Sequence, residues 1–201
     1  MTAETNPRPN PAELARLFEE QALPHTDALY RTALRMTRNA ADAEDLVQEA
    51  MLKAYRFFAR FEQGTNIRAW LFKIMTNLYI NRYRKKMRTP QELSIDEMED
   101  FVLFRQMTDS GAYDPSQPDE QVFGELFADR VREEIDRLPD EFRTVAVLAI
   151  LESFSYQEIA EIAGLQLGTV KSRLFRGRKI LQNRLADYAR QAGYRKEPAD
   201  S

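Results

Sequence analysis

The chain of 201 residues contains no cysteine, and this absence excludes two kinds of structure. Without thiols there is neither a disulfide framework nor a thiolate metal site, and the composition is compatible with a reducing compartment. Long apolar runs are missing as well, since no stretch approaches the roughly 20 residues that span a bilayer. The first ten residues lack the apolar core of a signal peptide. We therefore expect a cytoplasmic protein without membrane insertion.

Histidine is also scarce. The only one, His25, follows Pro24 at an expected helix break, where a structural role is more common than a catalytic one. The sequence shows no phosphate-binding loop, no Ser/His/Asp set and no cluster of metal-ligating residue types. We expect no catalytic residue, no metal site and no cofactor, so the chain is not predicted to be an enzyme.

Charge is unevenly distributed along the chain, although the formal net charge is only -3. Residues 81–88 carry five basic side chains and no acid, whereas residues 91–129 carry eleven acids and one base. A second basic stretch, residues 166–184, has six lysines or arginines and no acid. Two basic segments separated by an acidic one suit a protein that touches nucleic acid at two places.

Apolar residues recur at helical spacing over most of the chain, which predicts an all-α fold. We expect one or two helices within residues 11–38, interrupted at Pro24. A longer helix should follow, capped by Asn39 or Asp42, and a further amphipathic helix should run from about residue 67 to 84.

The expected architecture is two small helical domains joined by a flexible acidic linker. Residues 87–119 are rich in proline and acid, which favours an irregular linker with a short helix around 98–106. Pro139 should stop one helix and open the next, whose residues 142–151 are apolar almost all round and so belong at the centre of the second domain. The full division is a disordered N-terminus 1–10, a first domain 11–88, the linker 89–119, a second domain 120–190 and a tail 191–201.

Residues 155–179 have the pattern of a helix-turn-helix. Ser155 and Glu158 are spaced as a capping box, in which each side chain accepts a hydrogen bond from the other residue's amide. Gly164 stands where a left-handed residue ends a helix at little steric cost. A second helix should begin near Gly168, with an apolar side and an opposite side that carries Thr169, Ser172, Arg173, Arg176 and Lys179.

A basic helix of this kind can bind DNA. Phosphates attract the positive charge, and a helix fits the major groove, where arginine reads guanine edges with two hydrogen bonds. A solvated surface helix of an ordinary bundle would also be basic. The cap, the glycine turn and the one-sided charge occur in register here, which favours DNA binding.

Two further strings resemble a known family. DAEDLVQEAMLKAYRFFARF (residues 42–61) and IRAWLFKIMTNLYINRYRKK (67–86) resemble region 2 of bacterial sigma factors, and the helix-turn-helix string is similar to their region 4.2. Because only the linker lies between them, the layout resembles the extracytoplasmic-function (ECF) class, which lacks the extra domains of housekeeping sigma factors. The resemblance covers about residues 12–190. It implies a factor that binds core RNA polymerase, directs it to particular promoters and helps open them.

The resemblance also implies roles for individual residues. The positions that dock on a coiled coil of the largest polymerase subunit match Asp45, Gln48 and Glu49. The minus-ten element is expected to meet a loop and a helix in which aromatic rings can stack on bases while cations follow the backbone. The aromatic residues are Phe61, Trp70, Phe72, Tyr79 and Tyr83. The residues expected to receive the melted strand, with a flipped base, are Phe61, Asn66, Arg68, Lys73, Asn77, Asn81, Arg82, Arg84 and Lys85.

In the helix-turn-helix, two sets of positions match those that contact the minus-thirty-five element. The positions that meet base edges match Lys171, Ser172, Phe175 and Arg176. The positions nearer the phosphates match Tyr156, Thr169, Arg173 and Arg178, with Lys179 on the same helix. Gly177 departs from the commoner alanine, which lowers helix propensity by up to about 1 kcal/mol.

Within the class, the chain looks most like the group that answers thiol-oxidative or heat stress, whose members are commonly held inactive by an anti-sigma partner. That partner often carries a zinc-thiolate switch, and with no cysteine in this chain any such sensing belongs to the partner. Two other functions stay open at this point. A conventional DNA-binding regulator shares the helix-turn-helix but leaves residues 1–88 unexplained, and an all-helical enzyme acting on nucleic acid would need a catalytic cluster.

Overall fold

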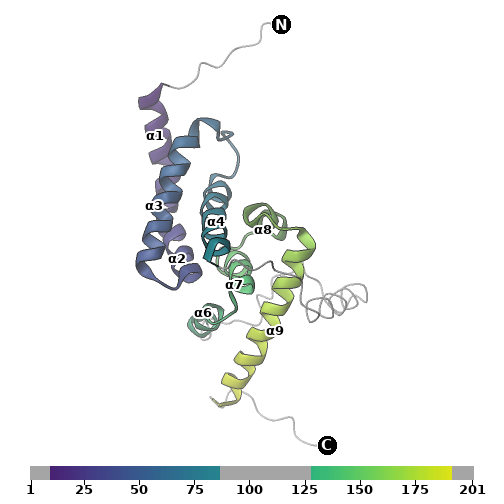
Figure 1. Cartoon of the computed structure of the whole chain (residues 1–201). Coiled ribbons are helices and arrows are strands. Elements are labelled where there is room, and N and C mark those ends of the chain that lie inside the picture. Colours follow the sequence, from purple (N-terminus) through teal and green to yellow (C-terminus); the bar gives the residue numbers. More distant parts are fainter. Residues whose placement is uncertain (1–9, 87–127, 192–201) are drawn as a thin grey trace, which may run out of the picture. The chain divides into compact units, whose positions relative to one another are not determined.

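The structure is a computed structural model that describes residues 10–86 and 128–191 (Figure 1). The chain divides into two compact units, Met1–Arg84 and Lys85–Ser201. No strand occurs among the described residues, so the all-α prediction is confirmed. The expected linker and its short helix around 98–106 lie outside the described residues, as do residues 1–9 and 192–201.

The described residues of unit 1 form four α-helices and two 3₁₀ turns. They are α1 (Pro11–Ala22), η1 (Leu23–His25), α2 (Thr26–Thr37), α3 (Ala40–Phe57), η2 (Phe58–Arg60) and α4 (Ile67–Lys86). The predicted interruption at Pro24 is present as η1. Asn39 caps α3, since its side-chain oxygen accepts the Asp42 amide at 3.0 Å, and α2 ends one residue earlier on left-handed Arg38.

The core of unit 1 lies where α2, α3 and α4 bury their apolar sides. Leu29 and Met36 of α2 and Leu46 of α3 are at most 1% exposed. The hydroxyl of Tyr79 in α4 donates to the Met36 carbonyl at 2.9 Å, which ties α4 to the end of α2. In α4 the side chains of Leu71, Phe72, Met75 and Thr76 are buried, and at 100° per residue they fall within one arc of about 140°. They form one broad buried face, as expected of an amphipathic helix.

Unit 2 is built around the helix that carries the predicted DNA face. Its elements within residues 128–191 are α6 (Ala128–Asp136), α7 (Asp140–Ala146), the π-helical turn η4 (Val147–Leu151), α8 (Tyr156–Ala163) and α9 (Leu167–Gln191). Pro139 ends α6 and precedes α7, as predicted. The segment 142–148 is buried throughout and forms the centre of the unit. The core cluster joins α6, α7, η4 and α9 through Val131, Ile135, Leu138, Phe142, Ala146, Val147 and Leu181.

Candidate polymerase and nucleic-acid interfaces

The predicted polymerase-docking residues lie on the exposed face of α3. Asp45, Gln48 and Glu49 are all exposed, whereas Leu46 and Ala50 on the other face are at most 2% exposed. Because the buried residues fix the helix against the core, the three polar side chains are held on a rigid surface. The same helix also exposes Leu52 and Tyr55.

An ion pair joins this face to the helix that carries the minus-ten candidates. The Arg82 guanidinium of α4 donates to the Glu49 carboxylate of α3. Both side chains are close to half exposed, at 44% and 47%. A residue predicted to meet polymerase and a residue predicted to meet DNA are therefore partners within the free chain.

The loop between η2 and α4 is held in a defined shape by its own hydrogen bonds. Gly64 has φ 89°, a left-handed conformation that favours glycine. The Thr65 hydroxyl donates to the Glu62 carbonyl at 2.7 Å. Asn66, a predicted minus-ten residue, caps α4, since its side-chain oxygen accepts the Ala69 amide at 3.0 Å. The Gln21 amide of α1 donates to the Gln63 side chain at 3.1 Å.

Phe61, the predicted stacking residue at the start of this loop, is only 8% exposed. Its ring stacks on Phe58 at 5.9 Å between centroids and meets Trp70 at 5.1 Å. Phe18 of α1 meets Phe58 edge-on, so the rings form one continuous aromatic cluster beneath the loop. Phe72 is fully buried as well. Phe61 thus serves to anchor the loop, and the buried rings of Phe61 and Phe72 present little surface to a base.

The polar minus-ten candidates occupy two sides of α4. At 100° per residue, Lys73, Asn77 and Asn81 fall on one stripe, and Arg68 and Arg82 lie about 40° apart on another side, about 140° and 180° away from Lys73. Lys73, Asn81 and Arg82 are exposed and Asn77 is half-buried. The Arg68 guanidinium lies 5.0 Å from the centre of the Phe72 ring. Arg84 and Lys85 belong to the helical backbone of α4, but their side chains lie outside the described ones.

The helix-turn-helix has the predicted local geometry. Ser155 and Glu158 form the capping box, with the Ser155 amide donating to the Glu158 carboxylate at 2.9 Å. Gly164 ends α8 in the left-handed conformation, at φ 64°. The Leu165 amide then donates to the Ala160 carbonyl at 3.0 Å, which closes the turn before α9.

In α9 the apolar side faces the core, as predicted. Val170 and Leu174 are at most 1% exposed, and Phe175, a predicted base-edge residue, is 9% exposed. Lys179 is exposed. The other predicted minus-thirty-five residues are half-buried, namely Tyr156, Thr169, Lys171, Ser172, Arg173, Arg176 and Arg178. The predicted DNA residues of this unit therefore sit at the edge of a packed surface, where their orientation is restricted.

Arg173 of α9 pairs with a carboxylate that the sequence pattern did not single out. Its guanidinium lies 3.8 Å from the Glu141 carboxylate of α7. The two side chains are 23% and 27% exposed. Glu141 lies in the string LPDEFR (residues 138–143), where the only local signal is an acid in the first turn of a helix.

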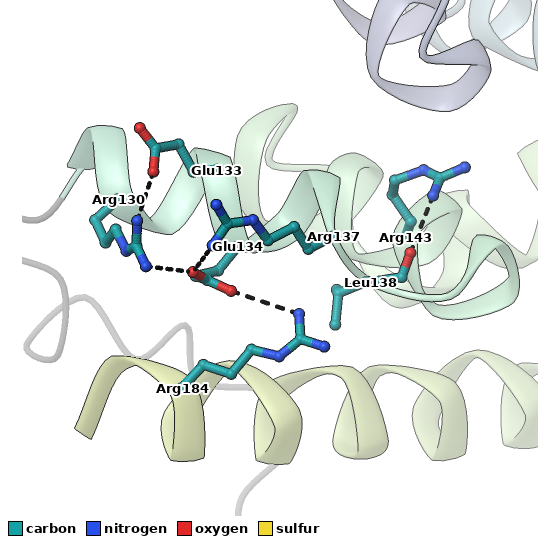
Figure 2. Close-up of polar contacts among 7 residues, drawn as sticks. All are labelled: Arg130, Glu133, Glu134, Arg137, Leu138, Arg143 and Arg184. Carbon is teal, nitrogen blue, oxygen red and sulfur yellow. Dashed lines mark hydrogen bonds and ion pairs between the residues drawn. The ribbon is translucent and has the colours of Figure 1, made fainter. Parts of the chain in front are cut away.

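A buried carboxylate in α6 gathers three arginines (Figure 2). The Glu134 side chain is 3% exposed, and it accepts from Arg130 at 2.9 Å, Arg137 at 2.7 Å and Arg184 of α9 at 3.4 Å. Arg184 is one of the six basic residues of the 166–184 stretch, yet it faces this acid. It therefore ties α9 to α6, and the DNA face has less free charge than the sequence count suggests.

Arg143 was likewise not predicted to matter, although its side chain is only 2% exposed. It donates to the Leu138 carbonyl at 3.0 Å (Figure 2) and pairs with Asp140. These contacts satisfy a carbonyl at the end of α6 and fix the bend around Pro139. The bend sets the course of α7, which packs against α9.

Two features of other protein classes do not occur in the described part of the chain. Among those residues, no group of three or more His, Cys, Asp or Glu side chains could hold a metal ion. No helix within residues 10–86 and 128–191 is long and apolar enough to cross a membrane.

Comparison with known proteins assigns both units. Residues 23–89 match the family model of sigma-70 region 2, and residues 128–181 match that of sigma-70 region 4. ECF RNA polymerase sigma factor SigW of Bacillus subtilis is 34% identical over 164 residues, which are 81% of this chain and 86% of that protein. The chain belongs to the ECF RNA polymerase sigma factors.

Other relatives of this sigma factor agree. ECF RNA polymerase sigma factor SigE of Mycolicibacterium smegmatis is 37% identical over 174 residues. The matched residues make up 86% of this chain and 63% of that protein. In solved structures, the sigma factor RpoE of Bartonella quintana, crystallised with the anti-sigma factor NepR, superposes with a TM-score of 0.59. The two sequences are 28% identical, and the superposition covers 85% of this chain and 98% of the RpoE chain. The resemblance to the ECF class is thus confirmed, and the family consists of transcription regulators rather than enzymes.

Proposed function

We propose that this sigma factor binds core RNA polymerase, directs it to stress-response promoters and promotes melting of the minus-ten element. The observation that carries the proposal is the presence of two different surfaces in two units of one chain. Unit 1 holds the exposed polar face of α3, and unit 2 holds a capped helix-turn-helix with a basic side. A conventional DNA-binding regulator needs only the helix-turn-helix surface. Neither surface needs a catalytic cluster for the proposed function.

Polymerase docking is assigned to Asp45, Gln48 and Glu49. Their support is the rigid backing of α3, because Leu46, Val47 and Ala50 are buried directly behind them. Polar groups at a preformed surface suit a complex that has to dissociate after initiation, since little apolar area is buried.

Capture of the melted strand is assigned to α4 and the loop before it. Lys73, Asn77 and Asn81 form a polar stripe that can follow a backbone and hydrogen-bond to bases. The aromatic cluster fixes the loop before DNA binds, and contacts of the ordered loop with a flipped base would offset the few kcal/mol that unstacking costs. Phe61 contributes as a support of that loop.

Binding to the minus-thirty-five element is assigned to α9. At 100° per residue the base-edge candidates Lys171, Ser172 and Arg176 span one continuous arc of about 140°, and Phe175, which is buried, supports this arc from within. The phosphate candidates Thr169 and Arg173 lie beyond one end of this arc, and Arg178 lies beyond the other. A helix seated in the major groove has this order, with bases facing its centre and phosphates on both flanks.

Regulation and location complete the proposal. A solved relative is bound to an anti-sigma factor, which supports control of this chain by a cognate anti-sigma partner. Any zinc-thiolate switch would belong to that partner, since this chain has no cysteine. We propose that the protein acts in the cytoplasm and has no catalytic activity of its own. The proposed domains are residues 11–88 and 120–190, joined by the linker 89–119.

The polymerase assignment is tested by reversing charge on the docking face. Asp45→Arg with Glu49→Arg should weaken binding to core polymerase by at least tenfold in a fluorescence titration, while the helical circular dichroism stays unchanged. The control is Glu19→Arg with Glu161→Arg, which changes the net charge equally at two exposed sites on other helices. Equal affinity of both double variants would reject α3 as the docking face.

A further inference from the structure

Two of the arginines assigned to DNA share a feature that neither unit requires for folding. Arg82 of α4 is paired with Glu49 of α3, and Arg173 of α9 is paired with Glu141 of α7. In each pair the acid comes from a neighbouring helix, and the partners are 33 residues apart in the first and 32 in the second. The arrangement therefore recurs independently in both units.

The pairs cannot be understood as essential supports of the core. Arg82 and Glu49 are each close to half exposed, and surface pairs of this kind contribute little to stability. Arg173 and Glu141 are more enclosed, but their closest atoms are 3.8 Å apart, a loose contact. A carboxylate at this place does affect one other process, DNA binding, since it neutralises a cation that would otherwise meet a phosphate.

We propose that Glu49 and Glu141 are internal counter-ions, which DNA phosphates have to displace from Arg82 and Arg173 before those arginines can bind DNA. The inference rests on the minus-ten role that the family resemblance implies for Arg82 and on the phosphate role proposed above for Arg173. Each pair lowers the affinity of the free chain, because a contact is broken for each one formed. The acids do not touch DNA; they set how strongly their arginines bind it.

The consequence runs opposite to that of losing a supporting contact. If the carboxylates merely held their arginines in a binding geometry, neutralising them would weaken DNA binding. If they compete with phosphates, neutralising them strengthens it. The free energy of an exposed ion pair, converted to a change in DNA affinity, corresponds to about a 1.4- to 5-fold gain per site.

The test uses the full chain and two fluorescent DNA probes, a single-stranded minus-ten oligonucleotide and a minus-thirty-five duplex, titrated by anisotropy at low and moderate salt. Glu49→Gln should tighten the single-stranded probe and Glu141→Gln the duplex, each by about 1.4- to 5-fold, with the larger gain at low salt. Glu44→Gln and Glu161→Gln are the matched controls, since they remove the same charge from exposed positions on α3 and α8. They should give a smaller gain.

Combined variants separate this inference from the function on which it rests. In chains that also carry Arg82→Ala or Arg173→Ala, the gain from the corresponding glutamine substitution should disappear. If the alanine variants weaken DNA binding but the glutamine variants behave like their controls, the counter-ion role is wrong while the DNA role stands. If the alanine variants leave binding unchanged, the DNA role of those arginines fails, and the inference fails with it.

Discussion

His25 is the only histidine of the chain, and it lies close to one of the residues assigned to the minus-ten element. Burial and the nearby Arg68 guanidinium both lower its pKa from the ordinary value of 6.5. The folded chain therefore favours the neutral ring. Since the unfolded chain binds this proton more readily, the resulting stability is present above about pH 6.5 and is lost as the pH falls through the lowered pKa.

We predict that His25→Asn removes this part of the pH dependence. Urea unfolding of the wild type should show stability falling as the pH drops below about 6.5, and the slope should be shallower in the variant. The chain has a single imidazole, so its NMR titration gives the pKa without assignment. A titration midpoint above the ordinary value of 6.5 would contradict a lowered pKa for this ring.

Two glycines of unit 2 should respond oppositely to alanine. A Cβ at Gly177 would meet Phe142 Cβ at 3.6 Å and Leu138 Cδ1 at 3.8 Å, which are ordinary contacts. Gly177→Ala should thus stabilise the chain by up to about 1 kcal/mol. Gly164 has φ 64°, so Gly164→Ala should destabilise it by about 1 to 2 kcal/mol. Denaturant midpoints measure both, and changes of the same sign would refute the argument.

At the level of elements, α9 should separate base reading from phosphate binding. Arg176→Ala should relax the preference at one or two minus-thirty-five positions, because a base-edge contact discriminates by about 1 to 3 kcal/mol. Arg178→Ala should weaken all sequences alike and lower the salt slope by about one unit, since one phosphate contact releases about one counter-ion.

Holoenzyme binding to a set of minus-thirty-five variants at several salt concentrations measures both effects. Arg132→Ala on α6 is a suitable reference, because it removes an exposed cation from another helix of the same unit. A uniform loss from Arg176→Ala together with altered preference from Arg178→Ala would mean that α9 lies rotated in the groove.

The elements that could be predicted from sequence are those fixed by near neighbours. Asn39, Ser155 and Gly164 each act within a few residues, so their patterns predicted helix ends that the structure confirms. The residues that sequence reasoning missed depend on distant partners. Glu134 meets Arg184 across 50 residues, and no local pattern marks such a pair. Phe61 is a similar case, because its burial depends on Phe58, Trp70 and the packing of α1.

The π-helical turn η4 is a further feature that periodicity did not reveal. Residues 142–151 are apolar almost all round, so an extra residue in one turn leaves no trace in the hydrophobic pattern. The Phe154 amide donates to the Leu148 carbonyl at 3.0 Å, which closes this segment before α8. The central position of residues 142–151 was therefore predictable from the sequence, whereas the π-helical hydrogen bonding of η4 was not.

For the whole molecule, the division into two units bears on how DNA is recognised. Each unit has its own core, and the two DNA surfaces belong to different units. We predict that the free chain binds a complete promoter duplex weakly, because aligning both units on one DNA costs ordering entropy that core polymerase would offset. Gel-shift affinity with and without core enzyme measures this, and tight sequence-specific binding by the free chain would favour a conventional DNA-binding regulator instead.

Trp70 is the only tryptophan, and it lies in the aromatic cluster of unit 1, against Phe58 and Phe61. The chain consequently carries one tryptophan fluorophore, which lies in one of its two units. Emission excited selectively at tryptophan follows the surroundings of the minus-ten loop, and circular dichroism follows the helices of both units together. Comparing the two signals during denaturation would show whether the units melt as one cooperative body or in separate steps, without attaching any label.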